Sequence, residues 1–337
     1  MKTFALLVYP DNIKQIRSFW PITRIMPDFL IKSCLKKLSP FRISRIKSLR
    51  SSQGREIQGY LIACHLLPEQ MAQLDKEFIL DKIIAAGKIA GRLGASILGL
   101  IGFTSIATDN EREITKGLKI PVNCGSALTA WSVFEAIYRT AKTKNIDLKK
   151  SSLAVIRASD AVGSLCARKL SEYVSKIIIT DRHGDKLIRL KEAIQHLSPI
   201  EIIIEDDVHK AVKDADIVII TEIPDSVLDI NEFKGGAIVC DLSISKSITK
   251  KVNKSHHAHF IEGGLIKLPY TAKIGKNLGL LKNIVTAPMA ETMLLTFAER
   301  FVSYSLGDNI NLDKLEEIAD LAVQHGFEVW VPEAPVV

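Results

Sequence analysis

The residues whose identity and spacing point most clearly to a chemical role lie between Ser151 and Leu170. Leu153 to Ile156 form a short apolar run, which is typical of a strand buried on both faces. Apolar residues at helical spacing follow from Val162. A strand, a tight turn and a helix in this order hold the pyrophosphate of a dinucleotide on the backbone amides of the turn. We therefore expect a cofactor-binding turn in this stretch.

The phosphate-binding turn normally carries glycine at three positions, which here are Arg157, Asp160 and Gly163. Only Gly163 remains, and it allows close packing of helix on strand. A side chain at position 157 crowds the path of a diphosphate. The Asp160 carboxylate would repel it, with about 4 kcal/mol between unit charges at roughly 4 Å and a dielectric of about 20. Because an arginine pairs with a nearby carboxylate, we expect Arg157 and Asp160 to occupy the phosphate site themselves.

The cofactor preference stays open. Asp181 and Arg182 follow the next expected strand, 176–180, about twenty residues after the turn. A carboxylate there would bind a ribose diol, whereas an arginine would bind a 2′-phosphate, so both NADH and NADPH fit the pattern. The remaining expected cofactor contacts lie in the turn, at the start of its helix and at the ends of later strands: Ser159, Val162, Thr221 and Gly263.

Three further residues could act on a carbonyl group. Cys124 could be a nucleophile, although a small buried hydrophobic role is commoner for cysteine. Ser126 precedes an expected helix at 127–142, whose first amides would suit a carbonyl oxygen or an anion; an ordinary serine cap is the alternative. Glu291 could position water or a carbonyl, but a carboxylate near a helix start also favours the helix dipole by itself.

Composition limits the function classes. The 337 residues are enough for two domains, and a net charge of +7 favours an acidic partner. No motif for nucleic acid accompanies that charge. The five cysteines are scattered without metal-ligand spacing, and His256, His257 and His259 lack a carboxylate or cysteine partner, so we expect no metal site and a reduced, cytoplasmic protein. We expect no leader peptide and no membrane-spanning segment.

The order of elements predicts an α/β fold. Apolar strands at 200–204, 216–220 and 237–240 alternate with helices at 184–196 and 206–213. This rhythm is typical of a doubly wound, mainly parallel Rossmann-type sheet. Outside it we expect a strand at 4–9, a helix after Asp11 and closing helices at 288–305 and 312–325.

A basic stretch covers residues 28–50, with seven Lys or Arg and one acidic residue, Asp28. Pro40 divides it into two short amphipathic pieces, which we expect to be solvated helices with cationic outer faces. The functional alternative is a surface that docks an acidic carrier protein or, by peripheral association, an anionic membrane.

The motifs together resemble a known family, the long-chain acyl-ACP reductases, which form fatty aldehydes, and their bacterial relatives described as shikimate- or amino-acid-dehydrogenase-like. The resemblance runs from about Ser48 to Val329, on these motifs in this order: Gly102-Phe103-Thr104-Ser105, Gly125-Ser126 with Thr129-Ala130, the 151–170 unit, Glu262-Gly263-Gly264, Ala290-Glu291-Thr292-Met293-Leu294-Leu295 and Gln324-His325-Gly326-Phe327.

The resemblance implies a layout and an activity. The layout is a Rossmann-type NAD(P)-binding domain at 149–287, between two parts of a second α/β substrate domain at 1–148 and 288–337. The activity is reduction of an acyl thioester to an aldehyde with NADPH, and the carrier of the acyl group is acidic, which suits the basic stretch.

The chain departs from the family at two places. The nucleophilic cysteine of the family aligns with Pro288, which has no nucleophile, and the phosphate turn has lost two glycines. Two hypotheses follow. In the first, the protein is an NAD(P)-dependent acyl-thioester reductase that uses direct hydride transfer or Cys124. In the second, it needs no cofactor and is a redox-inactive protein that binds acyl chains, an acyl carrier or a partner enzyme.

Overall fold

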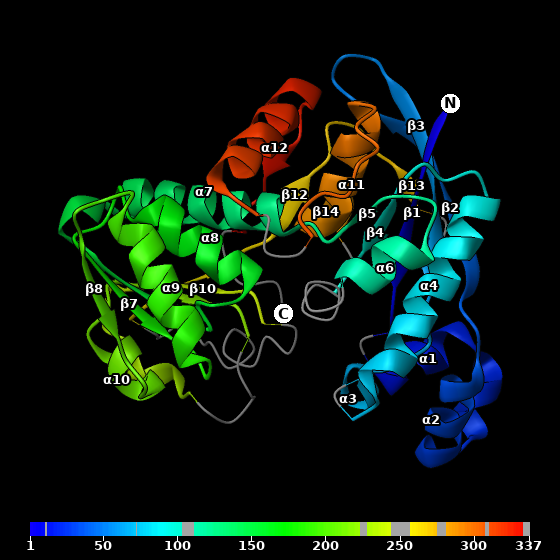
Figure 1. Ribbon diagram of the computed structural model, residues 1–337, viewed down its shortest axis with the longest axis horizontal. Coiled ribbons are helices and arrows are strands. Elements are labelled where there is room, and N and C mark those ends of the chain that lie inside the picture. The colour runs from blue at the N-terminus through cyan, green and yellow to red at the C-terminus, as the bar shows by residue number, and fades with distance from the viewer. Residues whose placement is uncertain are drawn as a thin grey trace. The chain divides into compact units, whose positions relative to one another are not determined.

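The structure is a computed structural model of the chain, and it describes residues 1–10, 12–71, 73–102, 111–222, 228–243, 257–274, 281–306 and 310–332. Its contacts divide the chain into two compact units (Figure 1). Unit 1 comprises Met1–Gly125, Leu268–Asn309 and Leu321–Phe327, and unit 2 comprises Ser126–Lys267, Ile310–Asp320 and Glu328–Val337.

Unit 2 is built on a six-stranded sheet in which every neighbouring pair is parallel. The strand order β11-β10-β9-β6-β7-β8 is the 3-2-1-4-5-6 order of dinucleotide-binding proteins, so the expected doubly wound Rossmann-type sheet is confirmed. The strands are β6 (Ser152–Ile156), β7 (Lys176–Thr180), β8 (Glu201–Ile204), β9 (Ile217–Ile220), β10 (Ile238–Asp241) and β11 (His259–Glu262).

Helices connect these strands because parallel neighbours need crossovers. The four residues of β9 are all buried, as expected for a strand covered on both faces. Helix α7 contacts α8 and β10, and β12 pairs with β15. The elements are α7 (Ser126–Lys144), η2 (Leu148–Lys150), α8 (Ala161–Leu170), α9 (Gly184–Gln195), α10 (Val208–Lys213), η3 (Ile230–Glu232), β12 (Leu265–Lys267) and β15 (Glu328–Val329).

Unit 1 has its own six-stranded sheet, in the order β13-β2-β3-β1-β4-β5. Strand β1 is parallel to β3 and β4, and β4 is parallel to β5, whereas β2 is antiparallel to β3 and β13. The strands are β1 (Lys2–Val8), β2 (Phe41–Arg50), β3 (Glu56–Ala63), β4 (Leu98–Leu100), β5 (Val122–Asn123) and β13 (Lys273–Ile274), and β14 (Ile284–Thr286) precedes α11.

Helices pack on both faces of this sheet. Helix α4 shares a hydrophobic core with Ala5 and Leu7, whereas α11 contacts β1, β3, β4 and β5 on the face where Gly99 approaches Thr292. A second α/β unit built from both chain ends is therefore confirmed. The helices are α1 (Ile13–Phe19), η1 (Pro21–Ile25), α2 (Asp28–Lys37), α3 (Pro68–Met71), α4 (Lys76–Arg92), α6 (Glu111–Gly117) and α11 (Ala287–Phe297). The last helix, α12 (Leu312–His325), has residues in both units.

Two expected elements are wrong. Residues 41–50 form β2 instead of a helix, because Pro40 prevents continuation of α2 and the segment pairs antiparallel with β3. Helix α11 ends at Phe297 instead of near residue 305, because Glu299 adopts a left-handed φ of 55° that terminates the helix. The cap of α1 is Asn12, which accepts from the Gln15 amide at 3.0 Å; Asp11 lies outside the described residues.

The contact units differ from the sequence-based division in several segments: residues 126–148, 310–320 and 328–337 lie in unit 2, and residues 268–287 lie in unit 1. Helix α7 lies with unit 2 because its contacts are with α8, β10, β12 and β15. The division into two domains, residues 1–148 with 288–337 and residues 149–287, stays a prediction. In the described part of the chain, no helix is both long and apolar enough to cross a bilayer.

We expect Gly59→Ala to lower the free energy of unfolding by about 1–3 kcal/mol, as overpacking of a core does. A Cβ atom at position 59 would lie 2.4 Å from the Phe4 ring, which is fully buried. Gly184→Ala is the matched control, since its Cβ would meet no atom within 4 Å. Denaturant unfolding measures both variants, and equal stability of the two would contradict this packing.

Candidate functional site

The turn between β6 and α8 carries its own anion. Asp160 caps α8, and its Oδ1 accepts from the Gly163 amide at 2.7 Å. In a dinucleotide-binding protein, a backbone amide at the start of this helix donates a hydrogen bond to the bound phosphate. The end of the helix that attracts negative charge is therefore already supplied with a carboxylate.

Arg157 preserves the shape of the turn without glycine. Its φ of 57° lies in the left-handed region, which residues with a side chain adopt at a cost. The expected pairing with Asp160 is wrong: the Arg157 side chain is exposed, and no ion pair within the described residues joins the two. Asp160 turns inward because the unpaired helix amide offers a closer and fixed partner.

Burial raises the pKa of the Asp160 carboxyl. A hydrogen bond from Thr221, the Gly163 amide and the Arg157 charge act in the opposite direction, and the charge of Asp181 adds to the rise. The hydroxyl of Thr221, which follows β9, is also within donating distance of the Ile156 carbonyl, at 3.1 Å, as an alternative acceptor for its single proton. The turn is thus tied to the neighbouring strand through one hydroxyl group.

Asp181 is also engaged within the protein. Its Oδ2 accepts from the Ser159 hydroxyl at 2.5 Å and from the Ser159 amide at 3.2 Å. Its Oδ1 accepts from the Arg182 amide at 2.6 Å, and the Arg182 side chain is exposed. The carboxylate that would bind a ribose therefore holds the phosphate turn in place.

Two glycines of the expected cofactor site are required by packing. A Cβ atom at Gly163 would lie 2.8 Å from the Arg157 carbonyl oxygen, and one at Gly263 would lie 2.7 Å from Cys240 Sγ. Burial raises the pKa of Cys240, so this thiol is neutral and a poor nucleophile. Val162 is half-buried on α8.

The structure places the expected cofactor residues in two groups. Arg157, Ser159, Asp160, Val162 and Gly163 lie in or directly after the turn. Asp181 and Thr221 contact that turn, whereas Gly263 packs against Cys240 at the end of β11.

Unit 1 contains a buried polar cluster at the first turns of α11. Asn123 Nδ2 donates to Thr292 Oγ1 at 3.1 Å, and Thr292 Oγ1 donates to the Pro288 carbonyl at 3.1 Å. Gly125 packs directly on Pro288, because a Cβ atom at 125 would lie 2.1 Å from Pro288 Cα. The position of the family's nucleophile is thus beside a loop that follows β5.

Glu291 belongs to the same region. Its side chain is fully buried. The pKa of Tyr304 is raised mainly by the burial of Tyr304 and, to a smaller extent, by the charge of Glu291. The Tyr304 amide donates to the Val122 carbonyl at 3.1 Å. Sequence reasoning missed Asn123, Thr292 and Tyr304; two of them stand inside quoted motifs or next to one, and this was the available signal.

Cys124 and Ser126 lie in different environments. Cys124 is 1% exposed and belongs to the hydrophobic core under α4, because neighbouring residues of β5 point to opposite faces and Asn123 takes the α11 side. Ser126 begins α7 and is also buried; its hydroxyl has no hydrogen-bond partner in the described structure. The catalytic roles of Cys124, Ser126 and Glu291 stay predictions.

The described residues include no cluster of ligands for a metal ion. His256 and the motif residues Phe103, Thr104 and Ser105 lie outside the described part of the chain.

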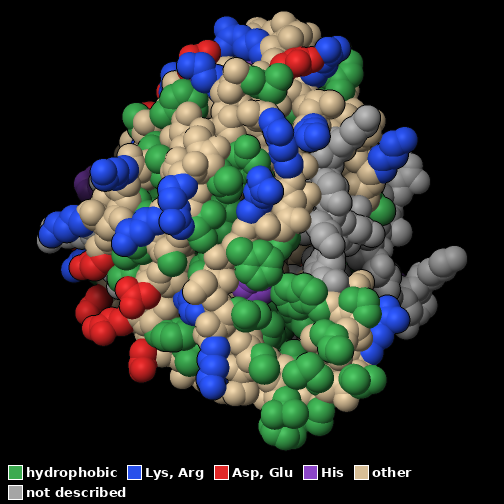
Figure 2. All heavy atoms as spheres, turned by 90° about the vertical axis from the view of Figure 1, so that its right-hand side faces the viewer, with side chains coloured by type: hydrophobic (Ala, Val, Ile, Leu, Met, Phe, Trp, Pro, Cys, Tyr) green, Lys and Arg blue, Asp and Glu red, His purple; other side chains and the backbone are tan. Residues whose placement is uncertain are grey.

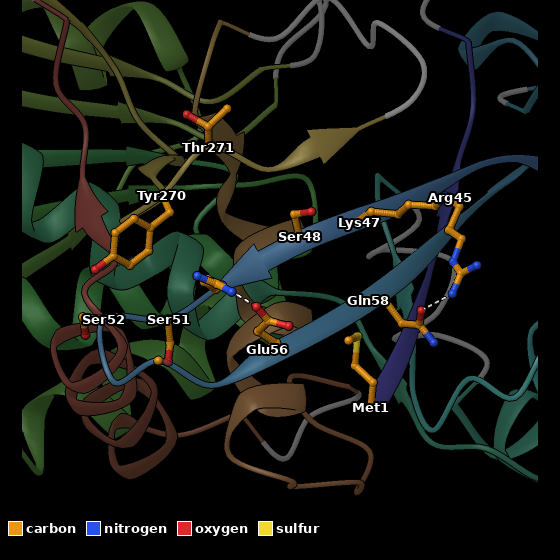
Figure 3. A pocket seen from close by; sticks show the side chains of 12 residues that line it. Met1, Arg45, Lys47, Ser48, Ser51, Ser52, Glu56, Gln58, Tyr270 and Thr271 are labelled. Carbon is orange, nitrogen blue, oxygen red and sulfur yellow. Dashed lines mark hydrogen bonds and ion pairs between the residues drawn. The ribbon is translucent and has the colours of Figure 1, made fainter.

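A cavity of about 740 Å³ opens on the β2 and β3 surface of unit 1 (Figure 3). Its lining includes Arg45, which donates to Gln58, and Arg50, which pairs with Glu56. Lys47 makes no ion pair with a described residue. Ser51 is buried, and its hydroxyl has no hydrogen-bond partner among the described atoms. The cavity lining therefore carries three cations and one acidic residue.

Comparison with known proteins supports the resemblance. The long-chain acyl-[acyl-carrier-protein] reductase of Synechococcus elongatus is 26% identical over 300 residues, which cover 83% of this chain and 85% of the reductase. Aminotransferase PigE of a Serratia species is 22% identical over 301 residues, covering 88% of this chain but only 35% of that protein. No family model matches the chain.

Solved structures add no further argument. Shikimate dehydrogenase from Aquifex aeolicus covers 94% of this chain and 97% of its own, with 11% identity and a TM-score of 0.38. L-Tryptophan dehydrogenase from Nostoc punctiforme covers 76% of this chain and 66% of its own, with 16% identity and a TM-score of 0.35. The fold rests on the strand order. The similarity to the acyl-carrier-protein reductase along most of both sequences confirms the resemblance that the motifs indicated.

We expect Asp160→Ala to lower the free energy of unfolding by about 1 kcal/mol, because the Gly163 amide loses its acceptor. Asp160→Asn keeps an acceptor oxygen and is the matched control. Because the pKa of Asp160 is raised on folding, the folded state retains a proton that the unfolded state releases. The wild type should therefore lose stability relative to Asp160→Asn as the pH rises from the unfolded pKa through the folded pKa. Denaturant unfolding at a series of pH values measures this gap, and a pH-independent gap would contradict it.

Proposed function

We propose that the protein binds an acyl thioester, or the acidic carrier that bears it, on a reductase-type scaffold without reducing it. The observation that carries the proposal is the Asp160 carboxylate, which takes the Gly163 amide at 2.7 Å. Similarity to an acyl-carrier-protein reductase over 83% of the chain supports the substrate class.

The residues at the turn do not fit a nicotinamide dinucleotide. A diphosphate there would meet the half-buried carboxylate of Asp160 and the side chain of Arg157. The carboxylate expected for the ribose, Asp181, is held by Ser159. The proposed function therefore uses neither NADPH nor NADH.

Covalent catalysis lacks its expected nucleophile. Pro288 stands at the family's cysteine position and is half-buried at the start of α11. Cys124, the residue that would have to replace it, is part of the hydrophobic core. Asn123 and Thr292 are fully buried beside Pro288, so a thioester that reaches Pro288 would meet no accessible thiol among the described residues of this region.

The cavity on β2 and β3 suits the carrier. Its cations Arg45, Lys47 and Arg50 outnumber its one acidic residue, Glu56. The carrier proteins implied by the resemblance are acidic, and their charge complements this lining. The other partner expected of stretch 28–50, an anionic membrane, would involve α2 and not this cavity.

An active NAD(P)-dependent reductase is the second candidate. The complete 3-2-1-4-5-6 strand order and the left-handed φ of Arg157 favour it, because both preserve the framework of a cofactor site. The two candidates separate on cofactor affinity.

We expect Arg157→Gly with Asp160→Gly to bind NADPH at least about tenfold more tightly than the wild type, a gain of about 1.4 kcal/mol. The reason is removal of one side chain and one negative charge from the phosphate path, while Gly163 and Arg182 remain. Isothermal titration calorimetry with NADPH and NADH measures both proteins.

The matched control for this titration is Asp185→Ala with Arg189→Ala, which removes the same two charge types from α9. It should bind like the wild type. Tight binding of NADPH or NADH by the wild type would overturn the proposal that the protein is redox-inactive, and the reductase would then be the proposed function.

We expect Pro288→Cys to become acylated by a long-chain acyl coenzyme A, whereas the wild type does not. The new thiolate would attack the thioester carbonyl, forming an acyl-cysteine and releasing the coenzyme A thiol; a helix start lowers the pKa of such a thiol. Cys34 is exposed, so both proteins also carry Cys34→Ser, which leaves four buried cysteines. Intact mass spectrometry counts the acyl groups. Acylation of the protein that retains Pro288 would show that a nucleophile exists elsewhere.

A further inference from the structure

Unit 1 exposes a group of large apolar side chains on η1 and the first turn of α2, which we name the apolar tip. A soluble protein usually scatters such side chains singly. Here four lie within nine residues, and their exposed fractions are large: Ile22 69%, Ile25 84%, Phe29 69% and Leu30 41%.

The apolar surface continues beyond the tip. Leu38 and Phe41 are each 40% exposed, and the Phe41 ring lies on His65 with ring centroids 4.5 Å apart. Burial lowers the pKa of His65 to about 4, so this ring adds no charge at neutral pH. Figure 2 shows hydrophobic side chains gathered in the lower part of this face, the level at which Figure 1 places α1 and α2.

The apolar tip is held in a fixed conformation. The Arg17 guanidinium donates to the Met26 carbonyl at 3.1 Å, to the Thr23 carbonyl at 3.4 Å and to Asp28 at 2.7 Å. A separate small core lies beneath, formed by Ile16, Ile31, Leu35 and Leu67. The exposed side chains are therefore not part of this core, and the fold presents them to the outside.

The sequence around the apolar tip is rich in cations. Residues 12–50 contain ten Lys or Arg and a single acidic residue, Asp28, whose carboxylate pairs with Arg17. Arg24 lies within the tip, and Lys14, Lys36, Lys37 and Arg42 lie on either side of it in sequence; all are exposed and make no ion pair with a described residue. An excess of fixed positive charge next to protruding apolar groups complements an anionic lipid surface, whose acyl chains take the apolar groups.

We propose that the apolar tip inserts Ile22, Ile25 and Phe29 into the interface of an anionic bilayer, with Lys36, Lys37 and Arg42 on the headgroups. A second copy of the chain is a poorer occupant, because two such surfaces would bring like charges together. The inference concerns η1 and α2 and does not rest on the proposed function.

The test is flotation of the full-length protein with vesicles of phosphatidylcholine alone or with phosphatidylglycerol added. We expect binding to the anionic vesicles that weakens with salt, because surface charges are screened within about 10 Å at 0.1 M. Ile25→Glu with Phe29→Glu should abolish it. Lys36→Glu with Lys37→Glu should weaken it at least about 25-fold, from a factor of about five for each cation lost.

Matched controls separate the surface from general changes of charge and hydrophobicity. Val323→Glu removes an apolar side chain that is 72% exposed on α12, and Lys186→Glu with Arg189→Glu reverses two charges on α9. Both should bind vesicles like the wild type. In the variant Phe29→Trp, the fluorescence emission of the introduced tryptophan should shift to shorter wavelength on anionic vesicles only.

Three results would overturn the proposal. One is the absence of vesicle binding at low salt by a folded wild type. Another is equal binding to neutral and anionic vesicles. The third is a wild-type dimer in sedimentation velocity that Ile25→Glu with Phe29→Glu dissociates, since a second copy would then cover the apolar tip.

Discussion

The hydrogen bond from the Gly163 amide to Asp160 is the interaction on which the interpretation of this protein depends. In a dinucleotide-binding fold, the amino end of the first helix is a site of positive potential that a ligand completes. Here the chain completes it with its own carboxylate. The sheet around this turn has the ordinary dinucleotide-binding strand order, so what is unusual here is a few side chains and not the architecture.

Much of the fold could be predicted from the sequence because its signals are local. The apolar runs of β6, β7 and β9 and the helical spacing of α8 lie within single elements, and their alternation allows few sheet topologies. The helix prediction for residues 41–50 was wrong because apolar and basic residues alternate there without a clear helical or strand period. The antiparallel pairing with β3, the next strand along the chain, and with β13, which is distant in sequence, decides that this segment is a strand.

The site was less predictable, because side-chain orientation depends on neighbours that the sequence does not reveal. The charges of Arg157 and Asp160 suggested an ion pair, but a desolvated amide on α8 attracted the carboxylate more strongly. Cys124 adjoined a motif, yet the alternation along β5 turns its side chain into the core. The cavity lined by Arg45, Lys47 and Arg50 needs two strands and the Tyr270 segment to exist, so no single stretch could indicate it.

The contact between Gly125 and Pro288 restricts the residue type at 125 but not the residue type at 288. The Cβ atom that glycine lacks would collide with the Cα atom at 288, an atom that every amino acid has. Glycine at 125 is therefore required by the backbone whatever residue stands at 288, proline or cysteine alike. The side chain at 288 can therefore change without disturbing this contact, and the backbone around it does not depend on which residue occupies the position.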